Sequence, residues 1–447
     1  MSHLHWRVWL LSAMGILLDG FDFFIVGVAI PLLRVYFDAS AVELGLVSSA
    51  AVLGAMAGAA TLGGLTDRIG RKVVLTLDLA FFVVFSIVCA LAPTIGVLIA
   101  FRFLLGVCIG ADYPLSASYL SEVAPARHRK RLLVSAFALQ AVGQLLGALV
   151  GLGVLLVTDD VGAWRWMLAA GIVPAAATAL LRRGLPESPR WLASVGRRDD
   201  AAAVTSVFVG RPVSAAQVVA DPAAPRVGFT TLFRGALRRR TVLASVPWFF
   251  MDIATYGVGV FTPTILAAMA ITGDGTFLSD DIASTEGAAV VDVFLIVGFA
   301  LAIVLIGRVD AVRLQTTGFA AMAAGLLALS LASALPGGGD DHLWLVFLGF
   351  GVFNLFMNAG PNATTFLMPT EIFPSEVRAG GHGLATSAGK AGAAVGLFFF
   401  PLLQDGIGLA WTLVLIAATS ALAGTVTHVL RSAAGLPPGT AAGGPAG

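Results

Sequence analysis

Long apolar stretches alternate with short polar ones along the whole chain. Most hold about 20 residues or more, enough for a helix to cross a hydrocarbon core of roughly 30 Å. We count twelve of them: 8–34, 43–63, 73–93, 95–122, 132–157, 163–182, 241–270, 287–307, 312–333, 343–368, 380–403 and 408–431. The pattern predicts an all-α integral membrane protein with twelve transmembrane helices.

Composition agrees with this pattern, because 58% of the residues are hydrophobic and only 12% are charged. A soluble domain has about 25% charged residues. The first apolar stretch continues into a full span, so we do not expect a cleavable signal peptide. The only two cysteines, Cys89 and Cys108, lie inside spans and predict no disulfide. A net charge of +1 carries no information about nucleic acid; the arginines are signals of topology, and no nucleic-acid partner is expected.

Basic and acidic residues fall in alternate loops. Arginines and lysines gather around 68–72, 126–131 and 182–240, whereas acidic residues dominate the opposite loops, as at 159–160 and 274–286. The positive-inside rule makes the basic side cytoplasmic. With an even number of spans, both termini are expected on that side of the cell (plasma) membrane.

The chain has two similar halves. Segment 121–129, SEVAPARHR, follows span four, and segment 370–378, TEIFPSEVR, follows span ten. Their matched residues Glu122 and Glu371 lie 249 positions apart. Two such halves, with a substrate held between them, are a known transporter design. The predicted domains are two six-helix bundles, a cytoplasmic central loop and a short flexible tail: 1–182, 241–431, 183–240 and 432–447.

Lys390 is the only lysine inside a span. A charge at the centre of a span costs several kcal/mol, so it needs a partner, an aqueous cavity or a neutral form. Its neighbours Gly389 and Gly392 are expected to leave room around the ammonium. Lys390 is therefore either a ligand cation or the partner of Asp252 or Asp112 in a structural ion pair.

Trp248, Asp252 and Tyr256 are spaced four residues apart in PWFFMDIATYG, so they share one face of a helix. An aromatic stripe is usually packing, but a carboxylate at its centre makes packing alone a poor explanation. The indole N–H and the phenol hydroxyl can both donate to oxyanion oxygens.

Two carboxylates, Asp19 and Asp22, are three residues apart in LLDGFDFF and lie near each other on the helix. Two neighbouring carboxylates in a low dielectric cannot both ionise cheaply, so one is expected to carry a proton. Asp112, in GADYPLSASYLSE, is a third carboxylate within a span. Such groups suit a proton carrier.

Three further charged residues inside spans bear on the interpretation. Asp78 is about one turn from the cytoplasmic end, where it could be solvated, and Asp292 lies near the outer end of span eight, where solvent is also expected. Arg102, in FRFLLG, is expected to brace a gate between helix and loop rather than to touch a substrate.

Several motifs resemble one superfamily of transporters. GGLTDRIGRK (63–72) resembles the loop motif of the major facilitator superfamily, and PESPRWL (186–192) resembles its sugar-porter-like branch. Four further stretches together resemble the phosphate:proton symporters of that superfamily: GADYPLSASYLSE (110–122), AFALQAVGQLLG (136–147), PWFFMDIATYG (247–257) and NAGPNATTFLMPTEIFPSEVRAGGHGLATSAGKAGA (358–393). The resemblance covers essentially the whole chain.

This resemblance implies roles for particular residues. The residues implied to bind phosphate are Tyr113, Gln140, Trp248, Asp252, Tyr256, Asn362 and Lys390. Those implied to transfer protons are Asp19, Asp22, Asp78 and Asp112. The loop motif and its counterparts predict a cytoplasmic gate, although the same charges would also serve as topology anchors. The gate residues are Gly63, Asp67, Arg71, Glu122, Glu371 and Arg378.

The sequence thus predicts a monomeric proton-coupled importer of inorganic phosphate that needs no metal or cofactor. Asp252 would repel a fully deprotonated anion but accept a hydrogen bond from one that keeps a proton, which favours phosphate over sulfate. Two alternatives stay open, a proton symporter for a sugar or small organic (aromatic) acid and a nutrient sensor on a transporter scaffold. The sequence has no nucleophile–base or nucleotide-binding pattern, so an enzyme is not expected.

Overall fold

The computed structural model describes nine stretches of the chain: 3–125, 128–158, 160–218, 229–269, 276–306, 308–336, 338–339, 341–374 and 377–431. In these residues the regular structure is helical apart from one isolated bridge between Ile306 and Val309. The predicted tail and residues 219–228 of the predicted central loop lie outside them.

The helices before the central segment are α1 His3–Phe37, α2 Ala41–Ile69, α3 Arg71–Ala90, α4 Ile95–Val123, α5 Arg129–Val157, α6 Trp164–Ala170 and α7 Ile172–Arg182. The central segment holds α8 Pro189–Ser194 and α9 Arg198–Val209. After it come α10 Gly235–Gly259, α11 Thr262–Ala268, α12 Phe277–Leu305, α13 Ala311–Ala334, α14 Leu343–Ala359, α15 Pro361–Ile372, α16 Arg378–Ile407 and α17 Leu409–Leu430.

Eleven stretches of the described chain are long and apolar enough to cross a membrane. In α4 the apolar part is shorter and covers Ile95–Gly110. Helices α6 and α7 together form one span, as do α14 and α15. The prediction of an all-α protein with many membrane spans is confirmed.

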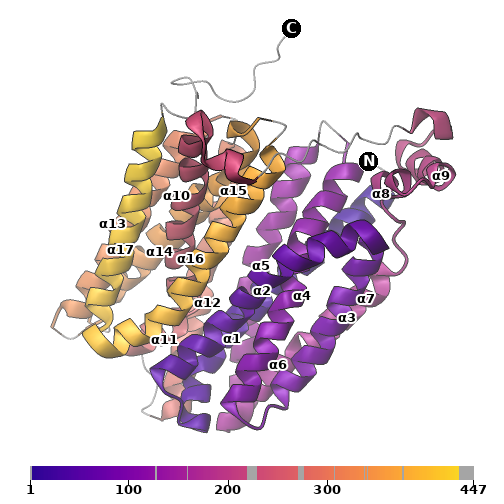
Figure 1. The fold of residues 1–447 in the computed structure, drawn as a ribbon. Helices are drawn as coiled ribbons and strands as arrows, with labels where there is room; N and C mark the ends of the chain where they lie inside the picture. The colour runs from indigo at the N-terminus through magenta and orange to yellow at the C-terminus, as the bar shows by residue number, and fades with distance from the viewer. Residues whose placement is uncertain are drawn as a thin grey trace. The chain divides into compact units, whose positions relative to one another are not determined.

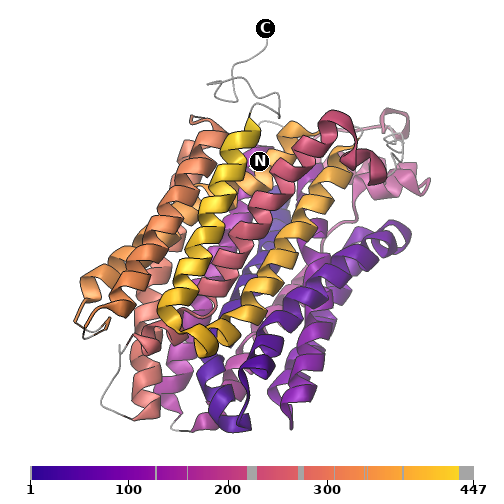
Figure 2. The same ribbon diagram turned by 60° about the vertical axis from the view of Figure 1, so that its left-hand side comes forward.

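The chain divides into two compact units. Unit 1 comprises Met1–Asp22, Ala50–Gly143 and Leu168–Arg226, and unit 2 comprises Phe23–Ser49, Gln144–Met167 and Val227–Gly447. Helices α1, α2, α5 and α6 each contribute to both units. In unit 2 the long helices α10, α13, α14, α16 and α17 run alongside one another (Figures 1 and 2). The domain boundaries expected from the sequence stay a prediction.

Small residues bring helix backbones close together inside each unit, as is usual for helices packed in a membrane. In unit 1, a Cβ at Gly106 or Gly110 of α4 would overlap the carbonyls of Ala51 and Ala55 of α2. In unit 2, α14 and α15 form one span that is broken at Gly360. Proline fits this first position of α15 because the first N–H groups of a helix have no intrahelical acceptor.

Candidate functional site

A carboxylate and an ammonium come together in unit 2. Asp252 of α10 is 5% exposed, and the indole of Trp248, one turn earlier, hydrogen-bonds to it. Lys390 of α16 lies close enough to interact electrostatically with this carboxylate. The helical spacing of Trp248 and Asp252 is what places both side chains on one face of α10.

The ammonium of Lys390 lies among aromatic rings. Its Nζ is 3.4 Å from the hydroxyl of Tyr256, 5.4 Å from the centre of the Tyr256 ring and 5.7 Å from that of Phe23. The rings of Phe23 and Tyr256 meet edge to face at 5.6 Å. We call Trp248, Asp252, Tyr256 and Lys390 the anion cluster. It offers a cation, two neutral donors and an acceptor, which is a suitable set for an anion that still carries a proton.

The glycines beside Lys390 pack against α10. A Cβ at Gly389 would lie 2.5 Å from Trp248 Nε1 and 2.9 Å from Asp252 Oδ2. A Cβ at Gly392 would overlap the carbonyl of Phe249. These glycines therefore allow α16 to approach α10 closely, and the expectation that they leave room around the ammonium stays a prediction.

Asn362 of α15 is half-buried, and α15 packs against α10. Thr365, one turn later, donates to the sulfur of Met251, and Thr255 donates to the sulfur of Met357. Of the other two predicted phosphate ligands, Gln140 is buried in unit 1, and the side chain of Tyr113 lies outside the described part of the chain. Their roles stay predictions.

Unit 1 holds the predicted proton carriers as buried ion pairs. Arg102 Nη1 donates to Asp22 Oδ2 at 2.8 Å, and Arg102 is only 1% exposed. Arg102 was expected at a gate between helix and loop, but it is the partner of Asp22. The pairing follows from desolvation, since each charge would be costly in the apolar interior without the other.

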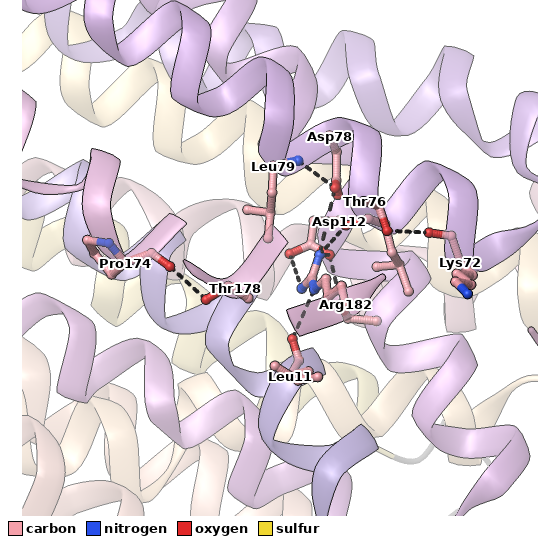
Figure 3. A network of polar contacts seen from close by, with 11 residues as sticks. Leu11, Lys72, Thr76, Asp78, Leu79, Asp112, Pro174, Thr178 and Arg182 are labelled. Carbon is pink, nitrogen blue, oxygen red and sulfur yellow. Dashed lines mark hydrogen bonds and ion pairs between the residues drawn. The ribbon is translucent and has the colours of Figure 1, made fainter. Parts of the chain in front are cut away.

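A second buried arginine, Arg182 at the end of α7, was not singled out by the sequence. It binds both oxygens of Asp112 at 2.9 and 3.0 Å and lies 3.7 Å from Asp78 (Figure 3). It also donates to the carbonyls of Leu11 and Leu75 at 3.1 and 2.8 Å. In the sequence it is the first of the many basic residues gathered in 182–240. The one available signal was its place at the end of an uninterrupted apolar stretch.

We call Asp78, Asp112 and Arg182 the carboxylate cluster. All three are buried, so the expectation that Asp78 could be solvated is wrong. Asp19 is near enough to act on Arg182 electrostatically. One guanidinium cannot balance two ionised carboxylates, so the cluster has a net negative charge unless it binds a proton.

Two acidic residues of α12 are also buried. Asp292 was expected near solvent and Asp281 in an acidic loop, yet they are 2% and 3% exposed within α12. Among the described residues, neither oxygen of Asp281 has a hydrogen-bond partner. Both expectations of solvation are wrong, because α12 extends beyond the apolar stretch from which its start was inferred.

The predicted gate residues of the first half meet PESPRWL. Arg71 forms an ion pair with Glu122, and Ser188 donates to the same carboxylate. The carboxylate of Glu187 accepts the backbone N–H groups of Arg71 and Lys72 at 3.0 and 3.1 Å. A carboxylate at a helix N-terminus satisfies free N–H groups and complements the helix dipole. The sequence did not assign Glu187 or Ser188 to the gate.

The remaining gate residues are not brought together in the described structure. Glu371 is exposed near the end of α15. The side chains of Gly63, Asp67 and Arg378 lie outside what the structure describes. The expected gate of the second half therefore stays a prediction.

These features define a multi-pass membrane transporter rather than an enzyme: many apolar helices that hold buried, paired ionisable side chains. The model of the family described as "Sugar (and other) transporter" matches residues 8–431. The chain belongs to this family, and with it to the major facilitator superfamily of transporters.

Two relatives and one solved structure show the range of similar proteins. The "Probable inorganic phosphate transporter 1-3" of Oryza sativa subsp. japonica is 31% identical over 503 residues, covering 97% of this chain and 93% of the relative. The "Putative metabolite transport protein YaaU" of Escherichia coli is 28% identical over 424 residues, covering 94% and 90%. The partially occluded inward-open xylose transporter XylE from E. coli superposes with a TM-score of 0.78 at 23% identity, covering 95% and 97%. This last likeness concerns the fold alone.

Proposed function

We propose that the protein imports inorganic phosphate together with protons across the plasma membrane, with both termini in the cytoplasm. The observation that carries the proposal is the anion cluster, in which Lys390, Asp252 and two aromatic donors converge. Relatives named as phosphate transporters, at about 30% identity over nearly the whole chain, support the same substrate.

The charges of the anion cluster favour phosphate over other anions. Lys390 offsets the charge of a bound anion, while Asp252 repels any ligand that has no proton to donate. Monohydrogen and dihydrogen phosphate carry such a proton at neutral pH, but sulfate does not. A hydrogen bond between the ligand and Asp252 involves a charged acceptor, which makes it stronger than a bond between neutral groups.

The buried ion pairs of unit 1 supply a route to coupling. A proton that binds Asp22 removes the charge that holds Arg102, and a proton in the carboxylate cluster does the same beside Arg182. Disrupting a buried ion pair changes the free energy by about 3–5 kcal/mol. Each charge moved inward gains about 2.3 kcal/mol per 100 mV of membrane potential. The energy gained by moving a charge across the membrane is therefore comparable with the energy needed to disrupt one of these ion pairs.

Uptake of radiolabelled phosphate into proteoliposomes tests the proposal. We expect accumulation with an alkaline interior, collapse of the accumulation by a protonophore, and weak competition by sulfate, glucose and benzoate. Proton-driven uptake of a sugar or an aromatic acid, with no uptake of phosphate, would overturn the phosphate assignment in favour of the organic-substrate alternative. Phosphate uptake that is indifferent to the pH gradient would overturn the coupling.

A further inference from the structure

Three asparagines, each one turn after the last, form a hydrogen-bonded chain in unit 2. The Nδ2 of Asn354 donates to the carbonyl of Val291 at 3.0 Å. Asn358 Nδ2 donates to the backbone carbonyl of Asn354 at 3.3 Å, and Asn362 Nδ2 donates to Asn358 Oδ1 at 2.6 Å. We call Asn354, Asn358 and Asn362 the asparagine ladder. It crosses the break between α14 and α15 and ends at Asn362, one turn before Phe366, whose ring meets that of Trp248 of the anion cluster at 6.4 Å.

The direction of the ladder is fixed by its backbone acceptors. A carbonyl oxygen can only accept, so Asn354 and Asn358 must each turn their NH₂ group toward one. The Oδ1 of Asn358 therefore faces Asn362. Because this oxygen can only accept, Asn362 donates to it through its own NH₂ group. The orientation of each carboxamide thus follows from the chain of bonds, although oxygen and nitrogen are otherwise hard to tell apart.

Burial gives the ladder its rigidity. Asn354 and Asn358 are 3% and 1% exposed, so a carboxamide turned the wrong way would leave buried polar groups unpaired. Asn362 is half-buried. Its Oδ1 accepts no hydrogen bond from the residues that the structure describes. This oxygen is therefore the acceptor that Asn362 keeps for a ligand.

We propose that the asparagine ladder makes Asn362 a hydrogen-bond acceptor for the substrate, so that Asn362 and Asp252 together demand a ligand with its own donor. The inference rests on the proposed function and defines its substrate class as protonated oxyanions. Asn354 and Asn358 are positioning residues, because they act through Asn362. A sulfate ion could satisfy neither Asp252 nor the Oδ1 of Asn362, and only one N–H of Asn362 would be left to donate to it, because the other donates to Asn358. A carboxamide that turned freely could instead offer sulfate both N–H groups.

The test compares dianionic phosphate with sulfate, which has the same charge and nearly the same size but no proton. Their affinities are measured on the purified full-length protein at alkaline pH. Asn358→Leu removes the acceptor that orients Asn362, and we expect the preference for phosphate over sulfate to fall roughly three- to tenfold, the equivalent of one neutral hydrogen bond. Asn358→Ala is a smaller replacement with the same expected result, in case the leucine does not fit.

One further variant separates orientation from stability. Thr364→Val is the matched control, since Thr364 is equally buried in α15 but donates only to backbone carbonyls of its own chain segment. It should lower stability without changing the preference.

The failures of the two proposals are distinguishable. Wild-type protein that binds no phosphate would overturn the proposed function. Wild-type protein that prefers phosphate, with the same preference in Asn358→Leu and Asn358→Ala, would overturn the ladder alone. Equal weakening of both anions in these variants would also overturn it, because it would show a merely structural role.

Discussion

Replacement of Arg182 by leucine tests how far the carboxylate cluster supports both the fold and the coupling. Arg182 is 1% exposed and holds both oxygens of Asp112 together with the carbonyls of Leu11 and Leu75. Leucine fills part of the same volume but offers none of these four hydrogen bonds. Asp112 and Asp78 are then left buried beside each other without a cation.

The loss is expected to be large. Removing one partner of a buried ion pair costs about 3–5 kcal/mol, because the other charge stays buried without compensation. Lysine should restore only part of this energy. A single ammonium cannot reproduce the planar, bidentate contact with both oxygens of Asp112. The backbone of α1 also limits the space around the side chain at position 182, because a Cβ at Gly15 would be 2.5 Å from Arg182 Nη2.

The free energy of unfolding in detergent, measured for the wild type and for Arg182→Leu, provides the first readout. The double variant Arg182→Leu with Asp112→Asn removes one of the two stranded carboxylates, so it should recover part of the lost stability. At lower pH the difference in the free energy of unfolding between the wild type and Arg182→Leu should become smaller, because a proton neutralises a stranded carboxylate. A second readout is proton-driven phosphate accumulation, which should fall even where the variant is stably folded.

Two results would refute this reasoning. Arg182→Leu with wild-type stability at neutral pH would mean that the ion pair contributes nothing to the folded state. A double variant no more stable than the single one would mean that the loss comes from packing rather than from stranded charge.

Three other substitutions test the proposed roles directly. Asp22→Asn should abolish proton-driven accumulation yet leave phosphate exchange intact, and wild-type accumulation in vesicles with this variant would contradict the coupling role. Lys390→Ala should weaken phosphate binding about tenfold to more than a hundredfold, the value of one charged hydrogen bond, and Lys390→Arg should recover little; unchanged binding in the alanine variant would place the anion elsewhere. Gly389→Ala should raise the dissociation constant for phosphate, because its Cβ would displace Trp248, whereas Gly383→Ala on the same helix meets nothing within 4 Å and should bind as the wild type does. Equal affinities in the two glycine variants would count against the close contact.

The sequence determined what depends on neighbours along the chain. The apolar stretches predicted the membrane helices, because the length of a span and its apolar character are local properties. Spacing by four residues placed Trp248 and Asp252 on one face of α10 for the same reason. The approach of Lys390 to Asp252 was one of two alternatives that the sequence left open, and the substrate role of both residues stays a prediction.

Only the tertiary structure decided which charges meet. Asp22 lies 80 residues from its partner Arg102 in the sequence, and Asp112 lies 70 residues from Arg182. Glu187 accepts a hydrogen bond from the backbone N–H of Arg71, which is 116 residues away. No local pattern encodes such pairs, since an arginine at the end of a span looks the same whether it faces water or a buried carboxylate. An unpaired charge is costly in an apolar interior, and this cost decides which carboxylate pairs with which arginine. The cost arises only once the helices have packed and the charges are enclosed.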